Sequence, residues 1–187
     1  MAAFAVAPDL GFSDNALRIA RLSALDWCAC TLAGVEEPVS RITRALVAEE
    51  GGRGEATVVG GGRAPARAAA LANGATSHAL DYDDTHFDYV GHPSVAIFPA
   101  ALAMAERLNA SGADLLRAFL VGVETACRIG HILGTPHYQF GFHQTSPSGS
   151  VGAAAAAARL MGLSASQATH ALGIAATRAS GLKSQFG

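Results

Sequence analysis

The chain has 187 residues, 13 of them basic and 15 acidic, and a formal net charge of −2. Half of the residues are hydrophobic and only 15% are charged, which excludes a disordered chain and provides enough apolar surface for one sizeable core. The basic residues are scattered singly, which argues against a nucleic-acid-binding protein.

Helical patterns with recognisable caps follow one another along the chain. Ser13 or Asp14 can cap the first helix, and Ser94 can cap the fourth. Ser164 and Gln167 have the spacing of a capping box at the start of the last. A short β-prone run at 56–59 is the exception. The predicted helices span residues 15–33, 38–51, 65–83, 94–108, 111–133, 153–162 and 164–180.

These elements predict an all-α fold in a single helical domain over residues 1–187. The 21 glycines and a still larger number of alanines favour helices that pack with their backbones close together. The charged residues are few for a chain of this size. We therefore expect part of the surface to be covered by a second subunit or a further domain.

The sequence predicts a cytoplasmic protein. Residues 1–8 are apolar but lack a basic start and are too short for the core of a signal peptide. No window of 18 uninterrupted apolar residues is present, so a membrane span is not expected. The three cysteines form no disulfide framework of the kind found in secreted proteins.

The first segment with reactive side chains is residues 78–94. If the third helix continues through it, His78, Asp81 and Thr85 share one helical face, with Asp84 near the same stripe. His92 stands just before the fourth helix. The positive end of that helix would favour a neutral imidazole that can accept a proton.

The second such segment is residues 141–149, which carry His143, Thr145 and further hydroxyls into the start of the alanine-rich helix. The free N–H groups and the dipole at a helix start bind anions, including carboxylates. Carboxylate-binding donors beside imidazoles suit proton abstraction next to a carboxylate.

Three plainer interpretations compete with this one. The acidic run can be a solvated helix end, and His143 can be a loop histidine bonded to the backbone. His78, Asp81 and His92 can also hold a metal in a helical hydrolase, but their spacing is not specific. We predict no metal and no cofactor.

At these residues the chain resembles the MmgE/PrpD family. The resemblance runs from about Ser13 to the end, through several motifs in the family's order. They are Asn73-Gly-x-x-x-His78-x-Leu-Asp81-Tyr-Asp-Asp-Thr85, His92-Pro-Ser, Gly141-Phe-His143-x-Thr145, Gly152-Ala-Ala-Ala-Ala, Leu160-Met-Gly-Leu163 and Ala179-Ser-Gly-Leu182.

The resemblance implies a large helical domain, a smaller α+β lid domain and an active site in the cleft between them. It implies a homodimer that acts on di- and tricarboxylates without cofactor or metal. The family includes 2-methylcitrate dehydratase of propionate metabolism, cis-aconitate decarboxylase and iminodisuccinate epimerase. Tyr82 and Gln144 stand where the family commonly has Phe and Pro.

Full members of the family are more than twice as long. In them, the segment that matches residues 181–187 leads to an active-site lysine, and Lys183 comes too early to replace it. We therefore expect the N-terminal part of the helical domain, with the lid absent. The 187 residues alone are expected to have little or no activity.

The predicted family activity is that of a lyase, which dehydrates 2-methylcitrate or a related hydroxy-polycarboxylate. One imidazole removes a proton beside a carboxylate, and the other imidazole or Asp81 protonates the departing hydroxide. Epimerisation and decarboxylation remain open, as does a non-catalytic helical remnant or interaction module. The predicted catalytic residues are His92, His143 and Asp81, and the predicted substrate-binding residues are Thr85, Thr145, Asp84 and His78.

Overall fold

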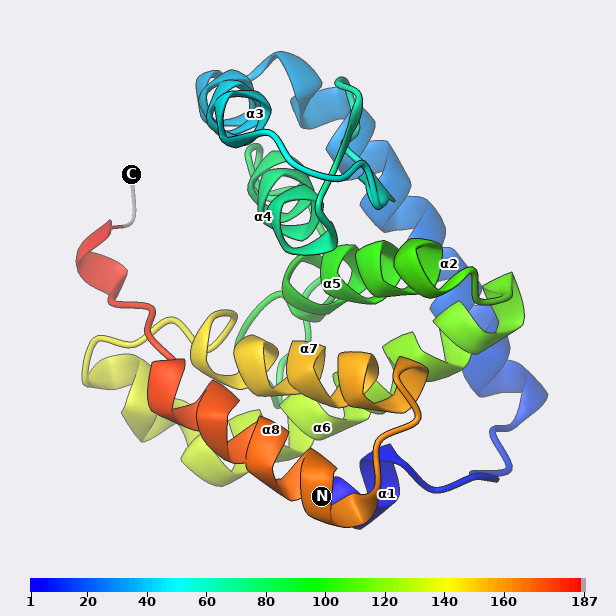
Figure 1. Ribbon diagram of the computed structural model, residues 1–187. Helices are drawn as coiled ribbons and strands as arrows, with labels where there is room; N and C mark the ends of the chain where they lie inside the picture. The colour runs from blue at the N-terminus through cyan, green and yellow to red at the C-terminus, as the bar shows by residue number, and fades with distance from the viewer. Residues whose placement is uncertain (186–187) are drawn as a thin grey trace.

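The computed structural model describes residues 1–185 and confirms the predicted helical fold (Figure 1). Phe186 and Gly187, the end of the last predicted loop, lie outside the described residues. The helices are α1 (Ala2–Ala5), α2 (Asp14–Ala33), α3 (Pro38–Glu50), α4 (Ala66–Ser77), α5 (Pro93–Leu108), α6 (Gly112–Gln139), α7 (Pro147–Leu160) and α8 (Ala165–Arg178). None of the helices in this part of the chain has the length and apolarity needed to cross a membrane.

The remaining elements are short. Strands β1 (Ala56–Thr57) and β2 (Arg63–Ala64) pair antiparallel, and β1 lies in the predicted β-prone run. Two 3-10 turns, Gly34–Glu36 and Lys183–Gln185, follow α2 and α8. The two-stranded sheet is therefore a minor element of a helical domain.

The helices form a row in which each packs on the next, in the order α3, α4, α5, α7 and α8 (Figure 1). α6 packs along α7, and α2 contacts α4, α5 and α6. The aromatic centre of the core lies among these helices, where the Trp27 and Phe98 rings are 4.8 Å apart and Phe98 and Phe119 are 5.2 Å apart.

Small residues let α6 and α7 approach closely, as the composition predicts. A Cβ atom added at Gly122 would lie 2.8 Å from the carbonyl oxygen of Gly152. A Cβ atom added at Gly152 would lie 2.6 Å from the carbonyl oxygen of Gly122. Only glycine fits both positions, because the two backbones touch there.

The predicted caps Ser13 and Ser164 are confirmed, and Ser111 caps α6 in the same way. The side chains of Ser13, Ser111 and Ser164 each accept a hydrogen bond from a backbone N–H of the first turn. Ser164 and Gln167 complete the capping box. Each of these bonds satisfies one of the N–H groups that a helix start leaves without a partner.

Four predicted boundaries are wrong around the two loops that carry reactive side chains. α4 ends at Ser77 instead of residue 83, and α7 begins at Pro147 instead of residue 153. α5 begins at Pro93 with His92 as its N-cap residue, so Ser94 lies inside the helix. α6 continues to Gln139 through a break at Gly134, whose φ of 63° is outside the helical region.

Candidate active site

Residues 78–92 form a loop, so the predicted helical face of His78, Asp81 and Thr85 does not exist. The chain turns at Asp81 and Val90, which both have left-handed backbone conformations with φ near 55°. The loop starts at the end of α4 and returns to the start of α5. His78 and His92, at its two ends, therefore lie side by side, with ring centroids 4.9 Å apart.

The second loop is held by the break in α6. Gln144 is fully buried, and its side-chain amide donates a hydrogen bond to the Gly134 carbonyl at 2.9 Å. The backbone N–H of His143 donates to the Gly181 carbonyl at 2.8 Å, in an antiparallel bridge between Phe142 and Leu182. This hydrogen bond explains why glutamine can stand at position 144, where the family commonly has proline.

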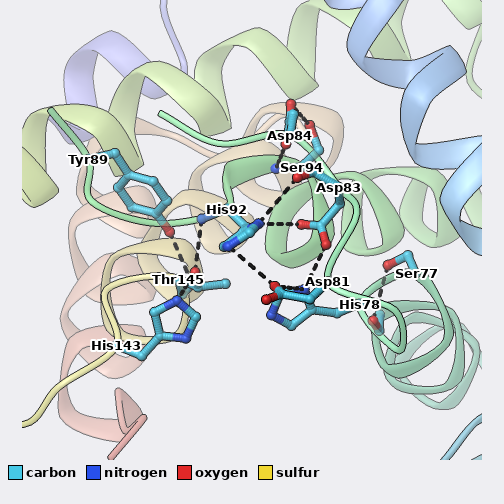
Figure 2. Close-up of polar contacts among 11 residues, drawn as sticks. Ser77, His78, Asp81, Asp83, Asp84, Tyr89, His92, Ser94, His143 and Thr145 are labelled. Atoms are coloured by element: carbon cyan, nitrogen blue, oxygen red, sulfur yellow. Dashed lines mark hydrogen bonds and ion pairs between the residues drawn. The ribbon is translucent and has the colours of Figure 1, made fainter. Parts of the chain in front are cut away.

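The two loops bring three imidazoles together at a cavity of about 800 Å³ (Figure 2). The His143 ring centroid lies 5.8 Å from that of His92 and 6.2 Å from that of His78. Five of the predicted site residues line this cavity. They are His78, Asp81, His92, His143 and Thr145.

Asp83, which the sequence reasoning did not select, lies between two of these imidazoles. Its side chain has no exposed surface, Oδ1 lies 2.8 Å from Nδ1 of His78, and Oδ2 lies 3.0 Å from Nδ1 of His92. Burial alone would raise the pKa of this carboxyl, but the hydrogen bonds from His78 and His92 outweigh it and lower the pKa to about 2. Asp83 is therefore a buried carboxylate.

Asp81, the predicted catalytic carboxylate, is three-quarters exposed at the edge of the cavity. Its Oδ1 atom lies 3.4 Å from Nε2 of His92 and 3.8 Å from Nδ1 of His78. The His92 ring is therefore placed between two carboxylates, one on each nitrogen (Figure 2).

The two histidines predicted to be catalytic differ in their protonation. The hydrogen bond to Asp83 raises the pKa of His92, and the charges of Asp83 and Asp81 add to this against the effect of burial. The expectation that the helix start keeps His92 neutral is wrong, because a carboxylate in direct contact outweighs a helix dipole. Burial lowers the pKa of His143, and the charges of His92 and His78 lower it further.

Thr145 joins the two loops. Its hydroxyl oxygen accepts a hydrogen bond from the backbone N–H of His92 at 2.9 Å and lies 3.0 Å from Nε2 of His143. Its carbonyl accepts a hydrogen bond from the hydroxyl of the buried Tyr89 at 3.0 Å. The predicted substrate-binding role of Thr145 stays a prediction, but its hydroxyl already connects the backbone of His92 to the imidazole of His143 (Figure 2).

The structure does not bring two of the predicted substrate-binding residues to the cavity. Asp84 accepts hydrogen bonds from the backbone N–H and the hydroxyl of Ser94, at 3.1 and 2.5 Å, and so caps the start of α5. Burial raises the pKa of its carboxyl. Thr85 is exposed and is not among the cavity-lining residues.

Three side chains that line the cavity and the buried Asp83 are of the types that also bind divalent cations. One ligand atom from each of His78, Asp81, Asp83 and His92 lies within 4.8 Å of the others. The Nδ1 atoms of both histidines are already hydrogen-bonded to Asp83. Hydrogen bonds and ion pairs account for the arrangement, and the absence of a metal stays a prediction.

A helical domain that gathers three imidazoles and one carboxylate at a cavity, with a second carboxylate buried against two of the imidazoles, has the residues of an acid–base site. The sequence matches the MmgE/PrpD N-terminal domain over residues 2–187, and the chain belongs to this family. The recognition made from the motifs is thereby confirmed.

Similar proteins are cis-aconitate decarboxylases. A cis-aconitate decarboxylase-like protein of Aspergillus oryzae is 34% identical over 90% of this chain and 37% of its own length. The cis-aconitate decarboxylase of Aspergillus terreus is 34% identical over 92% of the chain and 37% of its own length. The human enzyme is 40% identical over 63% of the chain and 25% of its own length. The chain thus spans about a third or less of the length of these relatives.

Proposed function

We propose that this chain supplies His92 and His143 as the proton-transferring pair of a lyase that acts on a small di- or tricarboxylate. The observation that carries the proposal is the shared cavity of two imidazoles whose pKa values move in opposite directions. Near neutral pH one ring is ready to donate a proton and the other to accept one. Enzymes obtain such a pair of one acid and one base by placing the two groups in different environments.

Dehydration uses both rings. Neutral His143 takes a proton from the carbon next to a carboxylate, and the C–H electron pair forms the new C=C bond. The C–O bond breaks, and protonated His92 gives its proton to the departing hydroxide, which leaves as water. The roles are assigned here by the two pKa shifts, so His143 is the base and His92 the acid.

Decarboxylation uses one proton donor. A carboxylate leaves as carbon dioxide, its electron pair stays on the carbon skeleton, and protonated His92 gives a proton to that carbon. The names of the relatives favour this reaction with cis-aconitate. The pair of oppositely shifted imidazoles favours dehydration of 2-methylcitrate or a related hydroxy-polycarboxylate.

Product analysis tests the proposal and separates the two reactions. The natural polypeptide that contains these 187 residues is incubated with cis-aconitate and with 2-methylcitrate in D₂O, and the products are followed by proton NMR. Release of carbon dioxide with one deuteron on carbon identifies a decarboxylase, and formation of an alkene from 2-methylcitrate identifies a dehydratase. Deuterium exchange without net loss of either group identifies an epimerase. Complete inertness toward small polycarboxylates would contradict the proposal.

We also propose a cytoplasmic homodimer as the assembly that carries this activity. The support is the exposed apolar surface on α2 and α3, where Leu25, Leu32 and Ile42 are about two-thirds exposed. Large apolar side chains in such numbers on neighbouring helices are typical of a surface that another chain covers.

A further inference from the structure

Asp83 is a buried ionisable residue in contact with two histidines that line the cavity. Its residue is 3% exposed, whereas Asp81, two positions away, has a side chain that is 75% exposed. A carboxylate is buried at an acceptable cost only where it is paired and hydrogen-bonded. Here both partners are imidazoles, one on each oxygen.

This contact fixes which nitrogen of each ring carries hydrogen. A carboxylate and a backbone carbonyl only accept hydrogen bonds. Nδ1 of His78 lies 2.8 Å from Oδ1 of Asp83, and Nδ1 of His92 lies 3.0 Å from Oδ2 and 3.3 Å from the carbonyl oxygen of the same residue, so both Nδ1 atoms must be N–H donors. The other nitrogen, Nε2, is then the atom that each ring uses toward any further partner. On His92 this atom faces Asp81, which lines the cavity.

We propose that Asp83 is a positioning residue that clamps His78 and His92 as a pair, each with Nδ1 protonated and with Nε2 as its working nitrogen. The proposal rests on the proposed function in so far as these rings act on a substrate. The geometry of the clamp belongs to the folded chain itself. Its consequence is that His78 is held in the same way as His92.

The clamp is tested in the 187-residue chain by ¹⁵N NMR of its histidine rings at a pH where the rings are neutral. We expect His78 and His92 to show the Nδ1–H tautomer. If both rings show Nε2–H instead, the proposal is overturned, whatever the activity of the protein. This measurement needs no variant, so it holds even where a change at Asp83 prevents folding.

The variant Asp83→Asn sharpens the test, because an amide offers one acceptor oxygen instead of two. One of the two rings then faces an NH₂ group. His92 keeps a second acceptor for its Nδ1–H, the backbone carbonyl of residue 83 at 3.3 Å, so His78 is the ring expected to move its hydrogen to Nε2. The matched control is Asp81→Asn, which changes an exposed carboxylate and should leave both tautomers as they are. The ring signals of the buried Trp27 and Phe119 report whether either variant is still folded.

The kinetic readout is made in the natural polypeptide. Asp83→Asn should lower kcat by up to ~10⁴-fold, the loss that follows when the carboxylate that orients a working imidazole becomes an amide, and should leave KM nearly unchanged. The descending limb of its pH profile should move to lower pH, since His92 loses the contact that raises its pKa. An unchanged pH profile with a folded variant would contradict the positioning role. If the wild-type rings show the expected tautomers but the wild-type protein is inactive, the proposed function is overturned and the positioning by Asp83 still stands.

Discussion

The charge on Asp83 makes the stability of the chain depend on pH at both ends of the range. Its pKa is lowered from an ordinary 3.8 to about 2, so its contribution is present above pH 3.8 and is lost as pH falls through 2. The pKa of His92 is raised above 6.5, so its contribution is complete below pH 6.5 and is lost as pH rises through the raised value. We expect the Asp83–His92 pair to contribute most to the Tm between about pH 4 and pH 6.5.

Thermal melts of the chain from about pH 2 to about pH 9 check this expectation. In Asp83→Asn both limbs should flatten, because the variant removes the carboxylate and the contact that holds the proton on His92. Identical pH dependence in the two proteins would show that the pair does not contribute to stability.

At the level of single residues, the sequence predicted which two segments meet but not how their charges are arranged. His78, Asp81, His92, His143 and Thr145 line one cavity as part of the predicted set. Asp83 was missed because three of the four residues in 81–84 are acidic, and only burial distinguishes them. The prediction of a neutral His92 is wrong for the same reason, since Asp83 is the residue that raises the pKa of His92.

At the level of the elements, Tyr89 of the 78–92 loop packs between α6 and the second loop. It contacts Gly130 on one side and Gly149 on the other. A Cβ atom at Gly130 would lie 2.6 Å from the Tyr89 ring and 3.0 Å from its backbone, whereas a Cβ atom at Gly173 in α8 would meet nothing within 4 Å. Gly130→Ala should therefore destabilise the chain by about 1–3 kcal/mol through overpacking. Gly173→Ala should stabilise it by about 0.5–1 kcal/mol, because alanine is the better residue inside a helix.

Urea unfolding of the two variants measures both effects with the same chemical change in two helices. Equal effects at the two positions would mean that the packing around Tyr89 is not tight. Because the Tyr89 hydroxyl donates to the Thr145 carbonyl, Gly130→Ala should also disturb the His143 ring signals, and Gly173→Ala should not.

The elements themselves follow from local signals wherever a cap is present. Ser13, Ser111 and Ser164 fix three helix starts, and these were predicted correctly. The end of α4 and the start of α5 depend instead on contacts across the 78–92 loop, such as the Asp84 carboxylate that caps α5 from ten residues away. Tertiary contacts of this kind leave no periodic pattern in the sequence.

The whole molecule exposes more surface than its mass requires. Its accessible area is 9623 Å², against about 8,400 Å² expected for a compact monomer of this mass. On α2, Leu25 and Leu32 are two turns apart on one face and are 67% and 68% exposed. This surface supports the proposed association with a second copy.

Analytical ultracentrifugation tests the association. We expect the chain to sediment as a dimer, with twice the 19.0 kDa mass of one chain. The double variant Leu25→Glu/Leu32→Glu should give the monomer, since two charges replace the apolar contact. Ile174→Glu, an equally exposed position on α8, is the matched control and should leave the dimer intact. A monomeric wild type, or dissociation of the control, would contradict this interface.

If His92 and His143 transfer protons in the proposed lyase reaction, the turnover of single variants shows it most directly. His92→Gln, His143→Gln and the exposed control His131→Gln are made in the natural polypeptide and assayed on the substrate that product analysis identifies. General acid–base catalysis contributes typically ~10²–10⁴-fold per group. We predict a loss of kcat of that size for His92→Gln in either reaction, a similar loss for His143→Gln in a dehydratase, and no loss for His131→Gln. Turnover unchanged in both His92→Gln and His143→Gln would contradict the account.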